Sequence, residues 1–286
     1  MIKVTDLYKN YNGHQVLKGV NFEVNKGDIY GFIGRNGAGK STTLNILTGL
    51  ITQTSGSFNI NNKQIGYLPE SPKFYDYMTA GEYLKFIGSL KKHPHITMRT
   101  DELLELVGLS DAKKRKIKNY SRGMQQRLGL ASALFHDPEL LLLDEPSSAL
   151  DPQGRKDILD TLVTLKNQGK TIFFSTHILD DVERVCNKIA ILNDGIIKLE
   201  STVKELINQY EDPIYKITTD TPFDTSQLKK MKDVVDVKKD DDEYIIYLNH
   251  HSKDILKQLT TLPITITSFN QKKSTLEDIF IRMVQS

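Results

Sequence analysis

The sequence predicts an α/β core followed by a small α+β domain. Two continuous apolar runs, at residues 139–143 and 171–174, are typical of strands that are buried on both faces of a parallel sheet. An amphipathic helix is predicted between them, at residues 152–167, and this strand–helix–strand order implies an α/β core. With 286 residues, the chain has room for one large domain and one small domain.

The N-terminal part of the chain begins with three predicted strands, at residues 2–7, 20–24 and 29–33. Each run is rich in β-branched or aromatic residues, and glycine, asparagine or lysine–glycine steps separate the runs. The pattern becomes helical after Gly39. A glycine-rich loop is therefore predicted to join the third strand to a helix.

The middle of the chain contains two further predicted helices. Residues 79–90 and 100–107 each place their apolar side chains on one face of a helix. The His93-Pro94 step separates them, because the residue before a proline disfavours the helical conformation.

The tail changes character at the polar, proline-containing residues 210–213, which we interpret as a linker. We therefore expect a first domain of residues 1–211 and an accessory domain of residues 212–286. The accessory domain is predicted to contain strands at 214–218, 234–237, 244–248 and 264–268 and helices at 253–259 and 275–284. Its acidic run 240–242 is expected at a hairpin tip, because it lacks the spaced ligands and central glycine of a calcium loop.

Charge and composition give expectations about the partners of the protein and its location in the cell. The chain has 38 Lys and Arg against 36 Asp and Glu, so its bulk charge does not call for nucleic acid or an acidic membrane as partner. The basic residues within 113–118 could bind nucleic acid or anionic lipid, but without interleaved aromatic residues they are interpreted as a solvated face. The single cysteine, Cys186, cannot form an internal disulfide, which indicates either a reducing compartment or a protein that is indifferent to redox conditions. Without a signal peptide or an apolar run of about 18–20 residues, the chain is expected to be soluble and cytoplasmic.

A phosphate-binding loop is predicted at residues 34–41, whose sequence Gly-Arg-Asn-Gly-Ala-Gly-Lys-Ser matches G-x-x-x-x-G-K-[ST] in full. The glycines let backbone N–H groups curl round phosphates, and the helix N-terminus adds partial positive charge. Lys40 would reach the β- and γ-phosphates, and the Ser41 hydroxyl would ligate Mg²⁺. The alternative is a glycine turn without a ligand, which the position between a strand and a helix disfavours.

The apolar strand at 139–143 is followed by two carboxylates, Asp144 and Glu145. Charge at the mouth of an apolar strand is costly unless a cation lies nearby, and Mg²⁺ would be that cation. Asp144 is therefore the expected metal partner. Glu145 would lie beside the γ-phosphate, where a carboxylate can orient and deprotonate the attacking water.

Five elements in a fixed order give the sequence a family resemblance. The phosphate loop is followed by Tyr-Ser-Arg-Gly-Met-Gln-Gln-Arg at 120–127, Leu-Asp-Glu-Pro at 143–146, Ser-Ala-Leu-Asp at 148–151 and Thr-His at 176–177. This order resembles the nucleotide-binding subunits of ABC transporters over about residues 1–210. The resemblance implies a P-loop ABC ATPase fold with a mixed sheet core, an antiparallel β subdomain and a helical subdomain at about residues 72–136. It also implies ATP and Mg²⁺ as ligands.

The resemblance assigns roles to residues outside the phosphate loop. Ser121 and Gly123 would lie at a second helix N-terminus that contacts the γ-phosphate bound by the opposite subunit; an ordinary helix cap is the alternative for Ser121. His177 matches the switch histidine that hydrogen-bonds the γ-phosphate. Asp151 matches the aspartate of a loop that crosses the dimer interface, and it also fits a cap before the proline at 152.

The adenine contact is less determined by the sequence. Tyr11 matches the aromatic residue that stacks on adenine, although Tyr8 lies close to it and a surface tyrosine is an alternative. The expected catalytic residues are Lys40, Glu145 and His177. The expected nucleotide contacts are Tyr11, Gly34, Asn36, Gly37, Ala38, Gly39, Lys40, Ser41, Thr42, Glu70, Ser121, Gly123 and Asp151. The expected metal ligands are Ser41, Asp144 and Glu70.

Two positions depart from the pattern of the family. Glu70 stands where the family usually has glutamine, and a carboxylate there can still ligate Mg²⁺ or hold water. Arg122 adds a charge to the Ser-Arg-Gly turn, so its contacts are expected to differ while the roles of Ser121 and Gly123 persist.

The resemblance implies an ATP-hydrolysing subunit that dimerises head-to-tail around two ATP molecules, with itself or a paralogous subunit. It would power separate transmembrane permease subunits from the inner face of the plasma membrane, and the permease would dock around residues 79–107. The tail resembles an accessory segment of exporters, which favours export of drugs or peptides. The alternative is a soluble ABC ATPase that acts on ribosomes or DNA. Such proteins usually carry two cassettes or a long coiled coil, so no nucleic acid partner is expected.

Overall fold

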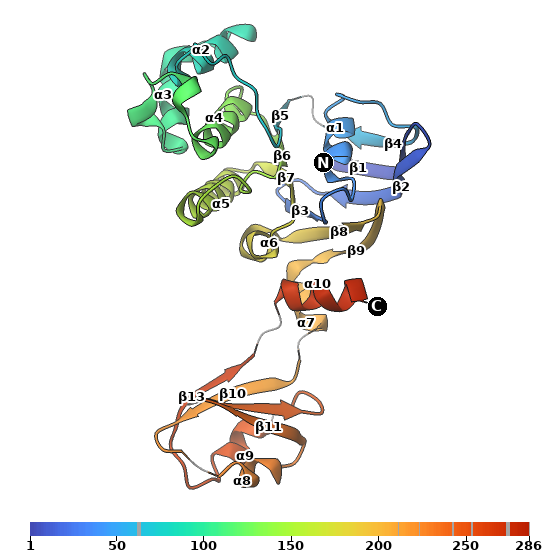
Figure 1. The fold of residues 1–286 in the computed structure, drawn as a ribbon, viewed down its shortest axis with the longest axis vertical. Coiled ribbons are helices and arrows are strands. Elements are labelled where there is room, and N and C mark those ends of the chain that lie inside the picture. Colours follow the sequence, from blue (N-terminus) through green and yellow to red (C-terminus); the bar gives the residue numbers. More distant parts are fainter. Residues whose placement is uncertain are drawn as a thin grey trace. The chain divides into compact units, whose positions relative to one another are not determined.

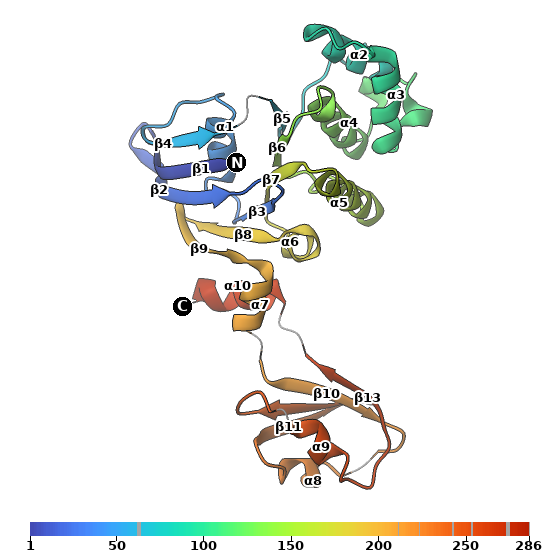
Figure 2. The same cartoon turned by 180° about the vertical axis from the view of Figure 1, so that it is seen from behind.

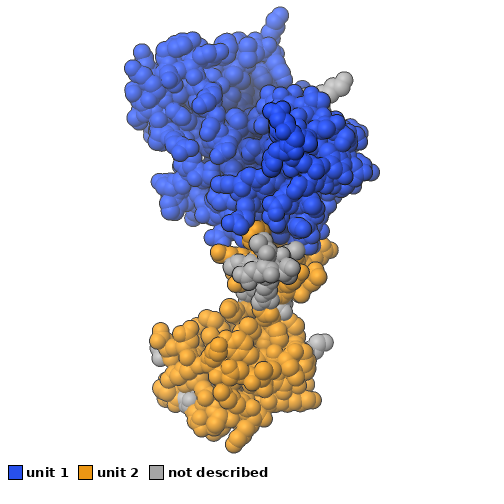
Figure 3. Space-filling view, turned by 45° about the vertical axis from the view of Figure 1, so that its right-hand side comes forward, with its two compact units in different colours: residues 1–203 blue, residues 204–286 orange. Residues whose placement is uncertain are grey.

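The computed structural model describes residues 1–61, 64–210, 212–222, 224–241, 243–252, 254–272 and 275–285. The chain forms two compact units, residues 1–203 and 204–286, which Figure 3 shows in different colours. This division lies one helix earlier than the boundary expected after residue 211, which itself lies outside the described residues. The expected limits of the two domains therefore stay a prediction.

A six-stranded sheet forms the centre of the first unit. Its strand order is β5-β6-β7-β3-β8-β9; the neighbouring strands from β5 to β8 run parallel, and β9 is antiparallel to β8. The strands are β3 (Ile29–Ile33), β5 (Ile65–Leu68), β6 (Leu140–Asp144), β7 (Thr171–Thr176), β8 (Lys188–Asn193) and β9 (Ile196–Thr202). Every residue of β3, β6 and β7 is buried, as the continuous apolar runs predict.

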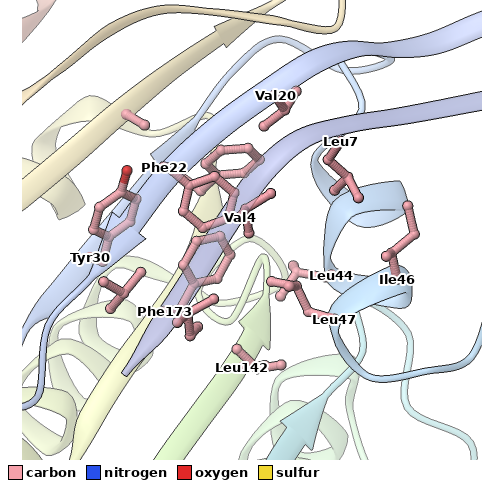
Figure 4. Close-up of a cluster of buried hydrophobic side chains, with 14 of the residues drawn as sticks. Val4, Leu7, Val20, Phe22, Tyr30, Leu44, Ile46, Leu47, Leu142 and Phe173 are labelled. Carbon is pink, nitrogen blue, oxygen red and sulfur yellow. The ribbon is translucent and has the colours of Figure 1, made fainter. Parts of the chain in front are cut away.

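An antiparallel sheet of order β2-β1-β4 lies against one face of this central sheet (Figures 1 and 2). It contains β1 (Ile2–Tyr11), β2 (His14–Val24) and β4 (Ser55–Ile60). Figure 4 shows the core between them, where the Phe22, Tyr30 and Phe173 rings lie against one another with centroids 5.5–5.8 Å apart. Such aromatic contacts add to the burial of large apolar surfaces. The predicted α/β fold with an antiparallel β subdomain is confirmed.

Helices cover both faces of the central sheet. Helix α1 (Lys40–Leu47) lies on the face that also carries the antiparallel sheet. Helices α4 (Arg122–Leu134), α5 (Pro152–Asn167) and α6 (Leu179–Val185) lie on the other face (Figures 1 and 2). The bounds of α5 agree with the predicted helix, and its Asp151 cap accepts a hydrogen bond from the Gly154 amide at 2.8 Å.

The helical subdomain contains α2 (Ala80–Leu90) and α3 (Ile96–Leu106), followed by the short 3₁₀ helices Ser110–Ala112 and Ile117–Asn119. A reciprocal pair of hydrogen bonds between Thr79 and Glu82 fixes the start of α2. Helix α3 starts four residues before the predicted position, because residues 96–99 continue the helical turn after His93-Pro94. The basic side chains between 113 and 118 lie at the surface, as the solvated-face interpretation predicts.

The second unit contains a four-stranded antiparallel sheet of order β11-β12-β10-β13. Between its strands the chain order is strand, helix, strand, strand, helix, strand, which with this sheet order is the ferredoxin-like arrangement. The elements are α7 (Val203–Gln209), β10 (Ile214–Thr219), α8 (Ser226–Lys229), β11 (Val234–Asp240), β12 (Glu243–Leu248), α9 (Ile255–Leu259), β13 (Ile266–Gln271) and α10 (Leu276–Gln285). Asp241, with φ of 49°, lies in the turn between β11 and β12, as predicted; Asp242 lies outside the described residues.

Several elements were not predicted. These are β4, β8, β9, α6, α7 and α8. The predicted strand at 264–268 was wrong in its bounds, because β13 begins at Ile266, after a bend at residues 262–264, and continues to Gln271. Among the described residues, no helix is both long and apolar enough to cross a membrane.

Candidate active site

The loop between β3 and α1 requires glycine at several positions. Gly37 and Gly39 have φ values of 85° and 109°, which side-chain-bearing residues rarely adopt. A Cβ atom on Gly34 would lie 2.5 Å from the carbonyl oxygen of Leu192, and one on Gly39 would lie 2.7 Å from Leu17 Cδ2. The loop can therefore curl tightly and present backbone N–H groups beside the N-terminus of α1.

Lys40 begins α1, and its ammonium group is buried in the loop. Nζ donates to the Gly34 carbonyl oxygen at 2.7 Å and lies 3.2 Å from Glu145 Oε1. Lys40 and Glu145 are 6% and 5% exposed, so each charge needs a partner of opposite sign or a strong hydrogen bond. This ion pair places the Lys40 ammonium group and the Glu145 carboxylate next to each other at the phosphate loop.

Asp144 ends β6 behind the loop. Burial raises its pKa, and the neighbouring Glu145 carboxylate acts in the same direction, whereas hydrogen bonds from the Ser175 and Ser41 hydroxyls lower it. Ser175 Oγ donates to Asp144 Oδ1 at 2.5 Å. A buried carboxylate with a raised pKa beside a serine hydroxyl fits a divalent cation, which would favour the ionised form.

The Ser41 hydroxyl and the Asp144 carboxylate are oxygen ligands of the kind that Mg²⁺ prefers. Glu70, the third predicted metal ligand, lines the same cleft as Ser41. Within the described residues, no cluster of three or more His, Cys, Asp or Glu side chains could hold a metal. Mg²⁺ commonly binds through one or two carboxylates together with substrate phosphates. The residues therefore fit a cation that is held jointly with a phosphate ligand.

Glu145 lies in the turn after β6, in a left-handed conformation with φ of 50°. Its Oε2 atom is 2.9 Å from Nδ1 of His177, which directly follows β7. Because β6 and β7 are parallel neighbours, their carboxyl ends bring Asp144, Glu145 and His177 to the same edge of the sheet. The Glu145 carboxylate, the Lys40 ammonium group and the His177 imidazole thus meet at the phosphate loop.

A cleft of about 530 Å³ opens above these groups. Nine of the predicted residues line it: Asn36, Gly37, Gly39, Lys40, Ser41, Thr42, Glu70, Glu145 and His177. Gly34, Ala38 and Asp144 are buried and do not line the cleft, although Lys40 Nζ donates to the Gly34 carbonyl oxygen. Val16 and Ser148 also line the cleft and were not predicted as contacts; Val16 belongs to none of the motifs, and Ser148 opens the Ser-Ala-Leu-Asp element, from which only Asp151 was assigned a contact.

Four further predicted contacts also lie outside the lining of this cleft: Ser121, Gly123, Asp151 and Tyr11. Ser121 caps α4 by accepting a hydrogen bond from the Met124 amide at 3.2 Å. Its cap and nucleotide roles are compatible, and the nucleotide role stays a prediction.

Tyr11 ends β1, is 43% exposed and lies beneath the Lys9 ammonium, 4.7 Å from the ring centroid. Tyr8, the alternative stacking residue, is half-buried, and its hydroxyl lies 2.7 Å from the place that a Cβ atom on Gly19 would take. Adenine stacking on Tyr11 therefore stays a prediction.

Comparison with known proteins agrees with this site. The family model described as "ABC transporter" matches residues 17–148. "Uncharacterized ABC transporter ATP-binding protein YxlF" of Bacillus subtilis (strain 168) is 37% identical, over 100% of this chain and 100% of its own. The chain belongs to the ATP-binding proteins of ABC transporters. Such proteins hydrolyse ATP at the site that the phosphate loop forms.

Further similarities extend to both units of this ABC transporter ATP-binding protein. A model described as "ATP-binding protein DrrA1-3-like, C-terminal domain" matches residues 202–284. "Bacitracin transport ATP-binding protein BcrA" of Bacillus licheniformis is 35% identical over 99% of this chain and 97% of its own. The structure described as the dimeric post-hydrolysis state of the cassette MJ0796 bound to ADP and Pi has a TM-score of 0.66 and 27% identity. The structural match covers 71% of the present chain and 99% of the MJ0796 chain.

Proposed function

We propose that this ATPase works as a head-to-tail dimer, with a second copy or a paralogous subunit, in which each protomer closes the other's cleft. The observation that carries the proposal is the division of the predicted contacts. The phosphate loop, Glu145 and His177 line one open cleft, whereas Ser121, Gly123 and Asp151 lie outside that lining. The similar cassette MJ0796 is described as a dimer with ADP and Pi. A partner protomer would bring the missing contacts to the cleft.

In the proposed reaction the loop amides and Lys40 hold the β- and γ-phosphates and neutralise their charge. Glu145 orients the attacking water and accepts its proton, and the contact with His177 fixes the direction of the carboxylate. His177 in turn donates a hydrogen bond to the γ-phosphate. Ser41, Asp144 and Glu70 are the residues that would hold Mg²⁺, which when bound neutralises the charge of the phosphates.

We also propose that ATP turnover powers separate transmembrane permease subunits from the inner face of the plasma membrane. The relative BcrA carries bacitracin transport in its name, and this supports an exporter of drugs or peptides. The permease would dock on the helical subdomain, around α2 and α3. Tyr75 and Tyr77, which precede α2, are 47% and 68% exposed and offer apolar surface for such a partner.

Glu145→Gln tests the site and the dimer together. The amide cannot accept the proton of water, so we expect kcat to fall by about 10²–10⁴. ATP should then remain bound and hold a dimer that light scattering detects in the presence of Mg²⁺ and ATP. Glu139→Gln is the matched control, because Glu139 precedes β6 with an exposed side chain. Undiminished hydrolysis by Glu145→Gln would show that Glu145 is not the base.

Purification from cells separates the two kinds of partner. A transport ATPase is expected to copurify with a membrane protein after detergent extraction. Copurification with ribosomes or DNA in place of a membrane protein, lost after nuclease treatment, would instead favour the soluble alternative.

A further inference from the structure

Ser175 lies beside both acids of the active site. It is the fifth residue of β7, it is fully buried, and the parallel register pairs it with Asp144 of β6. Its Oγ atom is 2.5 Å from Asp144 Oδ1 and 3.1 Å from the backbone nitrogen of Glu145. One hydroxyl therefore contacts two consecutive residues that have different expected roles.

The direction of these hydrogen bonds follows from the atoms present. A hydroxyl has one hydrogen to donate and two lone pairs to accept with. An ionised carboxylate only accepts and an amide N–H only donates, so Ser175 donates to Asp144 and accepts from Glu145. Alanine or valine at this position could do neither.

The backbone of Glu145 needs such support because it is strained. A φ of 50° is unusual for glutamate, and residues in this region persist only where their surroundings hold them. The Glu145 amide is held by the carbonyl and hydroxyl oxygens of Ser175, at 3.2 and 3.1 Å. Its carbonyl accepts from Ser148 Oγ at 3.1 Å and from Gln126 Nε2 at 3.4 Å.

This turn aims the Glu145 carboxylate. With the backbone held in this way, the two carboxylate oxygens lie 3.2 Å from Lys40 Nζ and 2.9 Å from His177 Nδ1. An extended backbone at Glu145 would continue the direction of β6 and carry the carboxylate away from both groups. The orientation of the base therefore depends on contacts behind it that touch no substrate.

We propose that Ser175 is a positioning residue for ATP hydrolysis: its single hydroxyl fixes the Asp144 carboxylate and the left-handed turn of Glu145 at the same time. The inference rests on the proposed roles of those two residues. Removal of residues that orient a metal ligand from behind commonly changes metal affinity or activity by about 10- to 100-fold.

The test compares Ser175→Val with Ser175→Thr, which have the same shape and differ only in the hydroxyl. We expect Ser175→Val to lower kcat per nucleotide-binding site about 10- to 100-fold and to raise the Mg²⁺ concentration for half activation. The KM for ATP should change little, because the loop contacts remain. Ser175→Thr should stay within about threefold of the unmodified protein, since its hydroxyl restores both hydrogen bonds.

Two further variants separate positioning from folding. Thr171→Val is the matched control, because Thr171 is a buried hydroxyl residue of the same strand whose Oγ1 accepts from the Gly27 amide at 2.9 Å, away from the site. Its kcat is expected to be unchanged. Ser175→Ala removes the hydroxyl without adding volume, so it should show the same fall in kcat and rise in Mg²⁺ requirement even if the larger valine side chain prevents folding.

The outcomes are distinct. Unchanged kcat and Mg²⁺ dependence in Ser175→Val and Ser175→Ala would overturn the inference, and so would an equal loss in the valine and threonine variants. Absence of hydrolysis by the unmodified chain would contradict the proposed function and, with it, this inference. A loss in the valine variant that threonine reverses supports it.

Discussion

Asp181→Ala is expected to destabilise the first unit strongly. Asp181 lies in α6 and is 1% exposed. One carboxylate oxygen accepts from the Ser147 hydroxyl at 2.5 Å, and the other accepts from Nε of Arg155 on α5. The carboxylate thus joins the turn after Glu145, the helix after Asp151 and the segment after His177.

The magnitude follows from what the substitution leaves behind. Ser147, itself 1% exposed, would retain a hydroxyl without a partner, at a cost of about 1–3 kcal/mol. The charged hydrogen bond of Arg155, whose side chain is 29% exposed, contributes about 1.5–3 kcal/mol. Together these agree with the loss of about 3–5 kcal/mol that is usual when one partner of a buried ion pair is removed.

Scanning calorimetry is the assay. For a unit of this size, a loss of 3–5 kcal/mol corresponds to a fall in Tm of roughly 6–20 °C. Asp160→Ala is the matched control, because its ion pair with Arg184 is exposed, with side chains 55% and 40% accessible, and is worth about 0–1 kcal/mol. Equal shifts in the two variants would refute the reasoning that the Asp181 carboxylate joins these three segments.

The remaining predictions concern charge and adenine. Burial raises the pKa of Asp144, so the folded protein binds its proton more tightly than the unfolded chain, and stability falls as pH rises past the ordinary pKa of about 3.9. In the absence of Mg²⁺ and nucleotide, Asp144→Asn should therefore have a higher Tm than the unmodified protein at pH 7. The difference in Tm should shrink toward pH 4. A lower Tm of the variant at pH 7 would contradict this prediction. Tyr11→Ala should raise the Kd for ATP about tenfold and Tyr11→Phe should not, since stacking on a base contributes about 1–3 kcal/mol; equal Kd values would remove Tyr11 from the site.

The parts of the fold that could be predicted are those in which local pattern and burial agree. Strand β3 and helix α5 have the predicted bounds, because one is wholly apolar and the other has a cap, a first-turn proline and one apolar face. Strand β4, with the sequence Ser-Gly-Ser-Phe-Asn-Ile, was missed because its residues are polar or half exposed. It forms a strand because β1 pairs with it, and sequence pattern does not reveal that partner.

In the active site, too, residues that belong to a local motif could be predicted, and residues placed by tertiary contacts could not. Lys40, Ser41, Asp144 and Glu145 belong to contiguous motifs whose chemistry can be recognised from residue type and spacing. Ser175 could not be recognised, because its role depends on the register that sets β7 beside β6. Val16 and Ser148 likewise reach the cleft through the course of β2 and of the turn after Glu145. For Ser175 and Val16 the contact comes from the fold, and for Ser148 the motif was recognised but its position on the cleft was not.

The shared site can be tested by mixing two variants that should each be inactive. Lys40→Ala removes the cation of the phosphate loop, and Ser121→Arg blocks the turn that would contact the nucleotide of the partner. In a mixed head-to-tail dimer, one site combines the intact loop of the Ser121→Arg protomer with the intact turn of the Lys40→Ala protomer. We predict that ATP hydrolysis reappears on mixing. A mixture as inactive as its components, or full turnover by Ser121→Arg alone, would contradict the proposal that two protomers share each nucleotide.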